Sequence, residues 1–437
     1  MSVNYALKSP RNSPSDFKKE RSPKMDKKIL IIGYVWPEPN TTAAGGRMLQ
    51  LIHFFLTQGY GITFASTAAE SDFSYDLNSL GVSKKAILLN HSSFDTFIKQ
   101  LNPNMVLFDR FMTEEQFGWR VVENAPNALR ILDTEDLHSL RISRQLAYKK
   151  SVPFTEQFWL EQDQTKREIA SIYRCDLSLI ISLYEMELLK RTIKMDDGLL
   201  LHLPIMFDAI DDEKQNNWLQ FDQKKDFVCI GNGKHAPNVN AIQTLKRDIW
   251  PFIRSDLPNT DLFIYGAYMP ESIKQLNKPK EGFHIMGHAD NASEVISKAR
   301  LNLAPLNFGA GIKGKLLRGM LVGTPSITTE IGAEGISENL PWNGVIANDP
   351  RSFAKAAVRL YQNEEKWSVA RQNGTHIINS FYDKAVLQKK LRDKIERLSR
   401  NIKGHRADNF IGAMLLHHTL AGTKFMSKWI AEKNSKP

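Results

Sequence analysis

Every second residue from 309 to 315, in the second half of the chain, is a glycine or a lysine: Gly309, Gly311, Lys313 and Lys315. They follow an apolar run and open a predicted helix that stops at the Gly-Thr-Pro sequence of residues 323–325. A glycine-rich turn before a helix leaves backbone N–H groups unpaired at the positive end of the helix dipole. Cations at this end do not favour the helix itself, but an anion shared with the N–H groups would explain them. The pattern predicts a phosphate site, and a solvated helix start is the alternative.

Asp136 and His138 come shortly after an apolar segment at residues 129–133 that is typical of a strand. Open parallel sheets bind ligands beyond the carboxyl ends of their strands, so chemistry is expected at this position. We interpret the carboxylate and the imidazole as candidate catalytic groups, although a histidine can also be structural. Asp109-Arg110 ends another predicted strand and could line the same side.

The residues give no support to metal-dependent chemistry. No group of His, Cys, Asp or Glu has the spacing of metal ligands, and Asp211-Asp212 is interpreted as solvated. The chain also has no Walker phosphate loop and no Gly-x-Ser-x-Gly sequence. We therefore expect no metal.

Short apolar segments alternate with segments of helical periodicity along most of the chain. Near-continuous apolar strands separated by helices are typical of a parallel sheet covered on both faces. A polar segment from Asp208 to Lys225 interrupts this alternation, which restarts at Asp226. The sequence therefore predicts an α/β protein with two doubly wound, Rossmann-like domains facing each other across a cleft. The predicted strands are 29–33, 61–66, 105–109, 129–133, 177–182, 199–203, 226–231, 261–266, 282–287 and 301–305.

A chain of 437 residues is too long for one ordinary core and suits two domains with extensions. One helix of the second domain is expected from about Asn238 to Arg254. We expect a disordered basic tail at 1–24, a first domain at 25–207, a linker at 208–225, a second domain at 226–380 and a basic helical extension at 381–437.

The composition, with 42% hydrophobic and 24% charged residues, is typical of a soluble globular enzyme. Cys175 and Cys229 lie in or beside apolar runs, which predicts buried reduced thiols and excludes a disulfide framework. The N-terminal residues contain no apolar signal-peptide core, and no window approaches a membrane-spanning helix. We expect a cytoplasmic protein.

Residues 28 to about 381 resemble the GT-B glycosyltransferases of group 1, also called family four. The most specific part is Phe308-Gly-Ala-Gly-Ile-Lys-Gly-Lys315 with Gly323-Thr-Pro325 and Ile331-Gly-Ala-Glu-Gly335. The segments 45–47, 133–141 and 231–238 are similar to loops of such enzymes. Order and spacing together carry this resemblance.

The resemblance implies a hexosyltransferase of glycan or polysaccharide biosynthesis. It would move a sugar from a nucleotide-sugar donor, held by the second domain, to a glycan, lipid-linked or protein acceptor at the first domain. Such enzymes usually need no metal or other cofactor, because protein cations and helix dipoles neutralise the departing diphosphate, and they usually retain anomeric configuration. Asp136 and His138 would be catalytic, and the donor-binding residues would be Gly45, Gly46, Arg47, His235, Gly309, Gly311, Lys313, Lys315, Arg318 and Glu334.

Two departures from the family pattern affect these expectations. Relatives commonly carry a glutamate in the helix of the phosphate unit, often binding the ribose, where this chain has Arg318; the earlier acidic position falls on Ala310. Arginine cannot accept a hydrogen bond from ribose hydroxyls, so either the ribose is held otherwise or Arg318 takes a phosphate. Relatives also often show His-Asp where this chain has Glu135-Asp136.

These departures leave other functions open. A non-catalytic nucleotide- or glycan-binding relative is one alternative, and a nucleotide-sugar epimerase of the same fold is another. Turn geometry alone would account for Gly45 and Gly46, and a helix or loop cap would account for Glu334.

The net charge of +10 is concentrated at the ends of the chain. Residues 1–24 carry a net +4 and residues 381–437 a net +8, which leaves −2 on the body and argues against a nucleic-acid partner. The basic ends are expected to be solvated, or to contact an anionic membrane surface peripherally, at its inner face. Packing against the body and a membrane-surface helix are the alternatives for the apolar residues Phe410, Ile411, Met414, Leu415, Phe425, Met426, Trp429 and Ile430.

Overall fold

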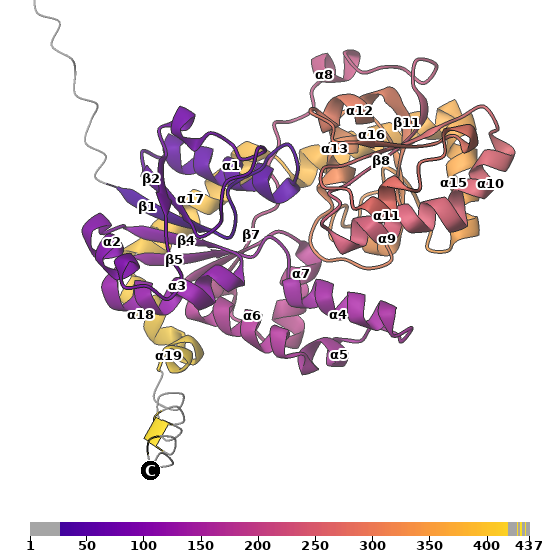
Figure 1. Cartoon of the computed structure of the whole chain (residues 1–437). Helices are drawn as coiled ribbons and strands as arrows, with labels where there is room; N and C mark the ends of the chain where they lie inside the picture. The colour runs from indigo at the N-terminus through magenta and orange to yellow at the C-terminus, as the bar shows by residue number, and fades with distance from the viewer. Residues whose placement is uncertain (1–26, 418–425, 427–428, 431–432, 434–437) are drawn as a thin grey trace, which may run out of the picture.

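The computed structural model describes residues 27–417, 426, 429, 430 and 433. Two α/β domains lie side by side, each built around a sheet in which every strand pairing is parallel (Figure 1). This arrangement confirms the predicted pair of doubly wound domains. The predicted disordered tail at 1–24 and Phe425 lie outside the described residues.

The first sheet has seven strands within the described residues, in the order β3-β2-β1-β4-β5-β6-β7. Its strands form because their apolar side chains alternate between two buried layers: Leu30 and Ile32 point to one face, and Ile29 and Ile31 to the other. The strands are β1 (Lys28–Gly33), β2 (Gly61–Ser66), β3 (Ser83–Ala86), β4 (Met105–Asp109), β5 (Leu129–Asp133), β6 (Leu177–Ile180) and β7 (Leu200–His202).

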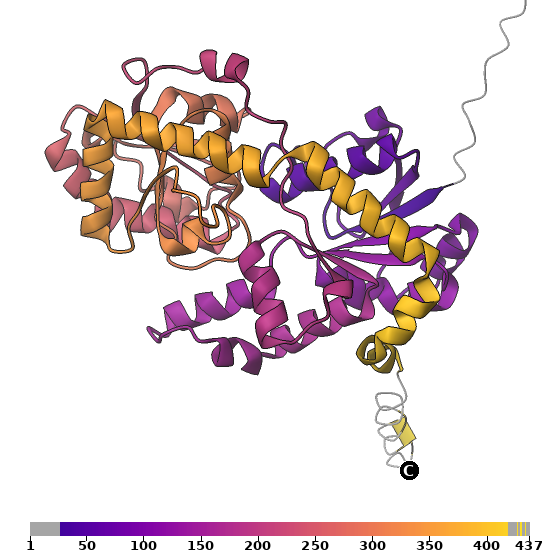
Figure 2. The ribbon, with the colours of Figure 1, turned by 180° about the vertical axis from the view of Figure 1, so that it is seen from behind.

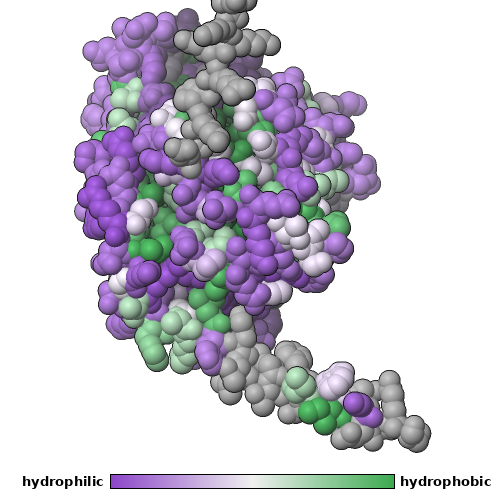
Figure 3. Space-filling view, turned by 90° about the vertical axis from the view of Figure 1, so that its left-hand side faces the viewer, coloured by the Kyte–Doolittle hydropathy of each residue, from purple (hydrophilic) through white to green (hydrophobic). Residues whose placement is uncertain are grey.

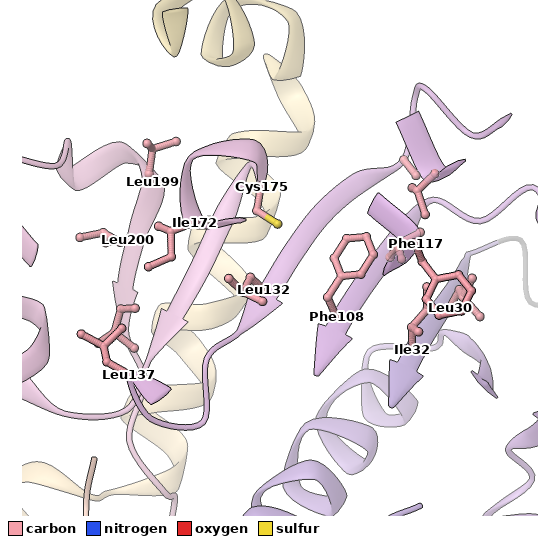
Figure 4. Packing of buried hydrophobic residues seen from close by; sticks show 14 of the residues in the cluster. Leu30, Ile32, Phe108, Phe117, Leu132, Leu137, Ile172, Cys175, Leu199 and Leu200 are labelled. Carbon is pink, nitrogen blue, oxygen red and sulfur yellow. The ribbon is translucent and has the colours of Figure 1, made fainter. Parts of the chain in front are cut away.

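Helices cover both faces of this sheet. On one face, Phe108 of β4 packs with Phe117 of a helix that follows it and with Leu30 and Ile32 of β1 (Figure 4). The helices of this domain are α1 (Ala43–Thr57), α2 (Ser93–Leu101), α3 (Phe111–Asn124), α4 (His138–Lys149), α5 (Glu156–Glu161), α6 (Asp163–Arg174) and α7 (Leu183–Thr192).

The second sheet has six strands within the described residues, in the order β10-β9-β8-β11-β12-β13. A short helix, α8 (Asp212–Asn216), lies in the predicted linker before it. The strands are β8 (Lys225–Ile230), β9 (Leu262–Tyr265), β10 (Phe283–Gly287), β11 (Ala299–Ala304), β12 (Ser326–Thr328) and β13 (Gly344–Ile346).

The single helix predicted from about Asn238 to Arg254 is in fact interrupted. A π-helical segment, Leu245–Ile249, separates two α-helices, and Pro251 stands at the start of the second. Proline has no N–H to donate to the preceding turn, which accounts for the break. The helices of this domain are α9 (Ala236–Thr244), α10 (Trp250–Asp256), α11 (Glu271–Lys274), α12 (Ala292–Lys298), α13 (Gly314–Leu321), α14 (Glu330–Ala333), α15 (Pro350–Gln362) and α16 (Glu364–Phe381).

The chain returns to the first domain after α16. Seen from behind, α16 runs along the second domain and α17 (Lys384–Arg400) crosses the back of the first (Figure 2). Leu387, Leu391, Ile395 and Leu398 of α17 recur every three to four residues and join the core on the α1 face of the first sheet. This helix therefore completes the first domain.

The last described helices, α18 (Ile402–Asp408) and α19 (Phe410–Leu416), also lie on the first domain. Arg406 donates hydrogen bonds to the carboxylate of Asp176 and to the carbonyls of residues 126 and 128. Phe410, by contrast, is 73% exposed. The predicted packing against the body thus holds for the start of the extension, while apolar residues of α19 face outward.

The surface of the first domain is mainly hydrophilic where it faces the viewer in Figure 3, with hydrophobic residues in small groups between the hydrophilic ones. Among the described residues, no helix has the length and apolar character needed to cross a membrane. Cys175 and Cys229 are both buried and unpaired, as predicted.

Candidate active site

A cavity of about 540 Å³ lies between the two domains. It is lined by the loops that follow β1, β4 and β5 in the first domain and β8, β9, β10 and β11 in the second. These loops stand at the carboxyl ends of parallel strands, where open α/β sheets bind ligands. A hydrophobic cluster with Ile205 from the first side and Leu316 and Ile377 from the second holds the domains together beside it.

The second-domain wall of the cavity is basic. Lys234, Lys313, Lys315 and Arg318 line it, and no carboxylate of this domain does so among the described residues. Burial lowers the pKa of Lys313 to about 8, and it also lowers the pKa values of Lys315 and Arg318. A buried cation without a counter-charge is unfavourable, so an anion in the cavity would be stabilised by this wall.

Lys315 and Arg318 are the two cations least engaged by the protein. The Nζ atom of Lys315 donates to the Oδ1 atom of Asn238 at 2.7 Å, a neutral partner. Within the described part of the chain, the guanidinium of Arg318 forms neither a hydrogen bond nor an ion pair. Both side chains project from α13 three residues apart, hence from neighbouring positions on one face. Together they could hold two negative charges.

The glycine turn before α13 is shaped by contact with the first domain. Gly311 has a φ of +64°, and a Cβ atom there would lie 2.8 Å from the Cβ atom of Asp136, so only glycine fits. At Gly309 an added Cβ would meet its neighbours at ordinary van der Waals distances. Lys313, the residue that caps α13, turns its Nζ atom to the carbonyl of Gly311 at 2.8 Å.

The backbone N–H of Gly311, which was predicted to be free for a ligand, already forms a hydrogen bond within the protein. The N–H of Gly311 donates to the Oε1 atom of Glu185 at 2.7 Å, and this carboxyl group also accepts from the N–H of Leu137. Burial raises the pKa of Glu185 to about 8. A carboxyl group of the first domain thus takes the place expected for a ligand oxygen at this amide.

The first-domain wall of the cavity, by contrast, carries more carboxyl groups than cations. Its lining includes four carboxyl groups and two guanidinium groups: Glu38, Asp109, Glu135, Asp136, Arg110 and Arg141. The predicted catalytic pair lies here, with the Nε2 atom of His138 3.1 Å from the Oδ1 atom of Asp136. The Nε atom of Arg141 donates to the other oxygen of Asp136 at 2.7 Å.

These contacts fix the protonation states of the predicted pair. Burial alone would raise the pKa of Asp136, but the cation of Arg141 and the ring of His138 hold it well below the usual range. Burial lowers the pKa of His138 to about 3, and that of His235 on the facing wall to about 4. Near neutral pH, Asp136 is therefore a firmly ionised carboxylate beside neutral imidazoles.

Other predicted donor-binding residues are divided between the cavity and the core. Gly45 lines the cavity, and a Cβ atom there would lie 2.4 Å from the backbone of Glu38. Gly46 does not line the cavity, and a Cβ atom there would meet no other atom within 4 Å. Arg47 is fully buried, ion-paired to Asp133 and hydrogen-bonded to the carbonyl of Leu203. The donors of Arg47 are thus used inside the first domain, and Arg47 does not line the cavity, so this geometry gives no support to the predicted donor contact.

Glu334 also lies off the cavity lining. Its carboxylate accepts two hydrogen bonds of 2.7 Å from Arg144 of α4, which also donates to the carbonyl of Gly309. His138, Arg141 and Arg144 recur every three residues on α4, so one helix face carries two residues that line the cavity and one that contacts the second domain. Sequence reasoning missed Arg144 and Glu185, because helical positions outside any motif carry no signal of the partner they meet.

The family model of the glycosyl transferases group 1 matches residues 224–363. The second domain is a group 1 glycosyl transferase domain. The match contains Lys234, the glycine turn before α13, α13 itself and Glu334, so the residues that build the basic wall belong to it. A search of the curated proteins found no match.

Solved structures share the fold of most of the chain, including both domains. Sucrose-phosphate synthase from Thermosynechococcus elongatus is 15% identical, with a TM-score of 0.62 over 85% of this chain and 99% of that chain. HepE from Anabaena, solved in complex with UDP and glucose, is 11% identical, with a TM-score of 0.60 over 85% and 100%. WaaG, a glycosyltransferase involved in lipopolysaccharide biosynthesis, is 13% identical, with a TM-score of 0.56 over 84% and 98%. With the family match, these likenesses confirm the resemblance to group 1 GT-B glycosyltransferases.

Proposed function

We propose that this group 1 glycosyltransferase moves a hexose from a nucleoside-diphosphate sugar to a hydroxyl group of a glycan, lipid-linked or protein acceptor. The observation that carries the proposal is the charge difference across the cleft. Four cations and no carboxylate line the second-domain wall among the described residues, whereas carboxyl groups outnumber cations on the first-domain wall. A diphosphate is therefore stabilised on one side only, and an uncharged hydroxyl-bearing molecule suits the other.

The chemistry follows from where charge develops. As the bond between the sugar and the diphosphate breaks, negative charge grows on the phosphate oxygens, and fixed cations at Lys315 and Arg318 stabilise it most in the transition state. These two residues would provide the charge that a metal provides elsewhere, so we propose metal-independent transfer. Among the described residues, no group of three or more His, Cys, Asp or Glu is arranged to hold a metal ion.

The anomeric outcome and the location of the protein are proposed from observations other than the charges of the cleft. Retention of the anomeric configuration is proposed from the resemblance to the group 1 enzymes. A cytoplasmic location, with peripheral membrane contact through the basic ends, is proposed from the charge distribution along the sequence. HepE is described in complex with UDP and glucose, which supports the choice of nucleotide sugars as the first donors to test.

The test begins with a thermal-shift screen of UDP, GDP, ADP and their sugars, because a ligand that binds only the folded state raises its stability. Release of nucleotide from the sugars that bind is then followed with methyl glycosides as acceptors. Lys315→Ala is expected to weaken binding of the nucleoside diphosphate by about 1.5–3 kcal/mol, the value of a charged hydrogen bond. Lys274→Ala, an exposed lysine of the same domain, is the matched control.

Three outcomes would contradict the proposal in different ways. Binding without turnover across donors and acceptors would favour a non-catalytic relative. An epimerised nucleotide sugar formed without an acceptor would favour an epimerase. If no nucleotide raised the melting temperature, the proposal that the protein binds nucleotides would itself be contradicted.

A further inference from the structure

Glu135 differs from the other carboxyl groups of the first-domain wall. Glu38, Asp109 and Asp136 all accept hydrogen bonds from protein groups. Among the described residues, none donates a hydrogen bond to the carboxyl group of Glu135, which nevertheless lines the cavity. Its oxygen atoms are therefore available to a ligand.

The backbone holds Glu135 in an unusual conformation. Its φ is +63°, in the left-handed region that is unfavourable for a residue with a Cβ atom. The turn is closed by the N–H of Asp136, which donates to the carbonyl of Thr134 at 2.8 Å. Strained residues of this kind persist where the surrounding structure imposes them, and they concentrate at functional sites.

The turn that carries Glu135 also touches the glycine turn before α13 in the other domain. A Cβ atom at Gly311 would lie 2.8 Å from the Cβ atom of Asp136 and 3.5 Å from the carbonyl oxygen of Glu135. The turn that carries this free carboxyl group thus lies where the basic wall and the first-domain wall meet. A molecule bound at the first domain would reach the donor at this point.

Charged groups from several elements act on this carboxyl group. Burial raises the pKa of Glu135 well above its ordinary value; Asp133 of β5 and Asp109 of β4 raise it further, and Arg110 and Arg47 oppose them. Lys313 of the second domain acts on the adjacent Asp136, whose pKa is held low by Arg141. Two neighbouring carboxyl groups pushed in opposite directions are typical of sites that bind and orient reacting groups.

We propose that the carboxyl group of Glu135 binds the acceptor, accepting a hydrogen bond from the hydroxyl group to be glycosylated. This inference rests on the proposed function. The hydroxyl oxygen forms the new bond to the anomeric carbon, the bond from that carbon to the diphosphate oxygen breaks, and the hydroxyl proton passes to the departing diphosphate. Glu135 orients the hydroxyl throughout, and its ionised form does so best because charged acceptors form the stronger hydrogen bonds.

The test compares Glu135→Gln with Glu123→Gln, the same change at an exposed glutamate of α3. Calorimetry with UDP and GDP measures the donor side, and methyl α-D-glucoside is the acceptor probe, both in nucleotide-release kinetics and in saturation-transfer NMR. For Glu135→Gln we expect nucleotide affinity within twofold of wild type. The kcat/KM for the glycoside should fall at least tenfold, mainly through KM, and its NMR binding should weaken in parallel. Glu123→Gln should change none of these.

The pH profile separates binding from a merely structural role. In the wild type, kcat/KM for the glycoside should rise with pH as Glu135 loses its proton, and Glu135→Gln should remove that rise. Glu135→Gly accepts the left-handed backbone without strain, so it should fold normally and still lose the acceptor effect.

Each contrary result has its own meaning. Wild-type protein that binds neither UDP nor GDP contradicts the proposed function. Wild-type turnover or glycoside binding that Glu135→Gln and Glu135→Gly preserve within twofold overturns the role of Glu135. Equal loss of nucleotide and glycoside binding would also overturn it, because the residue would then shape the whole cleft rather than hold the acceptor.

Discussion

The guanidinium group of Arg144 and the carboxylate of Glu334 form two parallel hydrogen bonds of 2.7 Å across the boundary between the domains. The Arg144 side chain is 5% exposed and that of Glu334 is 15% exposed, so water screens the pair little. Because Arg144 also donates to the carbonyl of Gly309, the same side chain holds the glycine turn before α13. The position of the domains and the shape of the glycine turn beside the cavity are therefore linked through one residue.

Arg144→Ala should open the cleft and weaken nucleotide binding together. Removing one partner of a buried pair leaves the other charge unpaired, at a cost of about 3 kcal/mol or more. Small-angle scattering should show a larger radius of gyration, and calorimetry a weaker affinity for UDP or GDP. Arg167→Ala breaks an ion pair with Glu115 whose arginine side chain is 57% exposed, and serves as the control. An unchanged radius for Arg144→Ala would show that other contacts suffice to keep the domains closed.

Arg318→Glu tests whether this position faces the phosphates. The substitution puts a negative charge on a wall that otherwise carries cations, so affinity for UDP and GDP should fall at least tenfold. Affinity for uridine and guanosine, which lack phosphate, should change much less. Arg359→Glu makes the same charge change at an exposed position of α15. Equal nucleotide affinities before and after the change at 318 would place the guanidinium away from the nucleotide.

Glu185 should make stability depend on pH. Burial raises its pKa from 4.5 to about 8 in the folded state, so between these values the folded protein holds a proton that the unfolded chain has lost. Raising the pH through this window therefore favours unfolding, by about 1.4 kcal/mol per pH unit from this group. Glu185→Gln keeps an oxygen acceptor for the N–H of Gly311 but cannot ionise.

Denaturant unfolding at several pH values checks this expectation. The stability of Glu185→Gln relative to wild type should increase from about pH 4.5 to about pH 8 and then level off. Glu123→Gln, at an exposed site, should follow the wild-type curve. Parallel curves for Glu185→Gln and wild type would mean that the carboxyl group titrates normally in the folded protein.

Local patterns in the sequence predicted the strands well because apolar runs of this kind leave few alternatives. The predicted strands 61–66, 105–109 and 129–133 have the observed bounds. The basic side of the cleft could also be predicted, because Lys313 caps one short helix and Lys315 and Arg318 lie on it.

Contacts between distant segments could not be predicted in this way. Arg47 follows two glycines that suggested a phosphate contact, yet its partner Asp133 lies 86 residues away and takes it into the core. The N–H of Gly311 meets Glu185 over a separation of 126 residues. Periodicity identifies which face of a helix is buried, but the packing of the whole chain decides what it meets.

The docking of α17 on the first domain gives a final prediction. Leu391 is fully buried in the core on the α1 face, although it stands far from that domain in the sequence. Leu391→Ala should lower the free energy of unfolding of the first domain by about 2–5 kcal/mol, because it removes buried methyl groups and leaves a cavity. Val386→Ala, at a position of the same helix that is 52% exposed, should change it by no more than about 0.5 kcal/mol. Denaturant unfolding followed by tryptophan fluorescence and circular dichroism measures both variants. If Leu391→Ala were as stable as Val386→Ala, α17 would contribute little to the stability of the first domain and would be held only by its connection to α16.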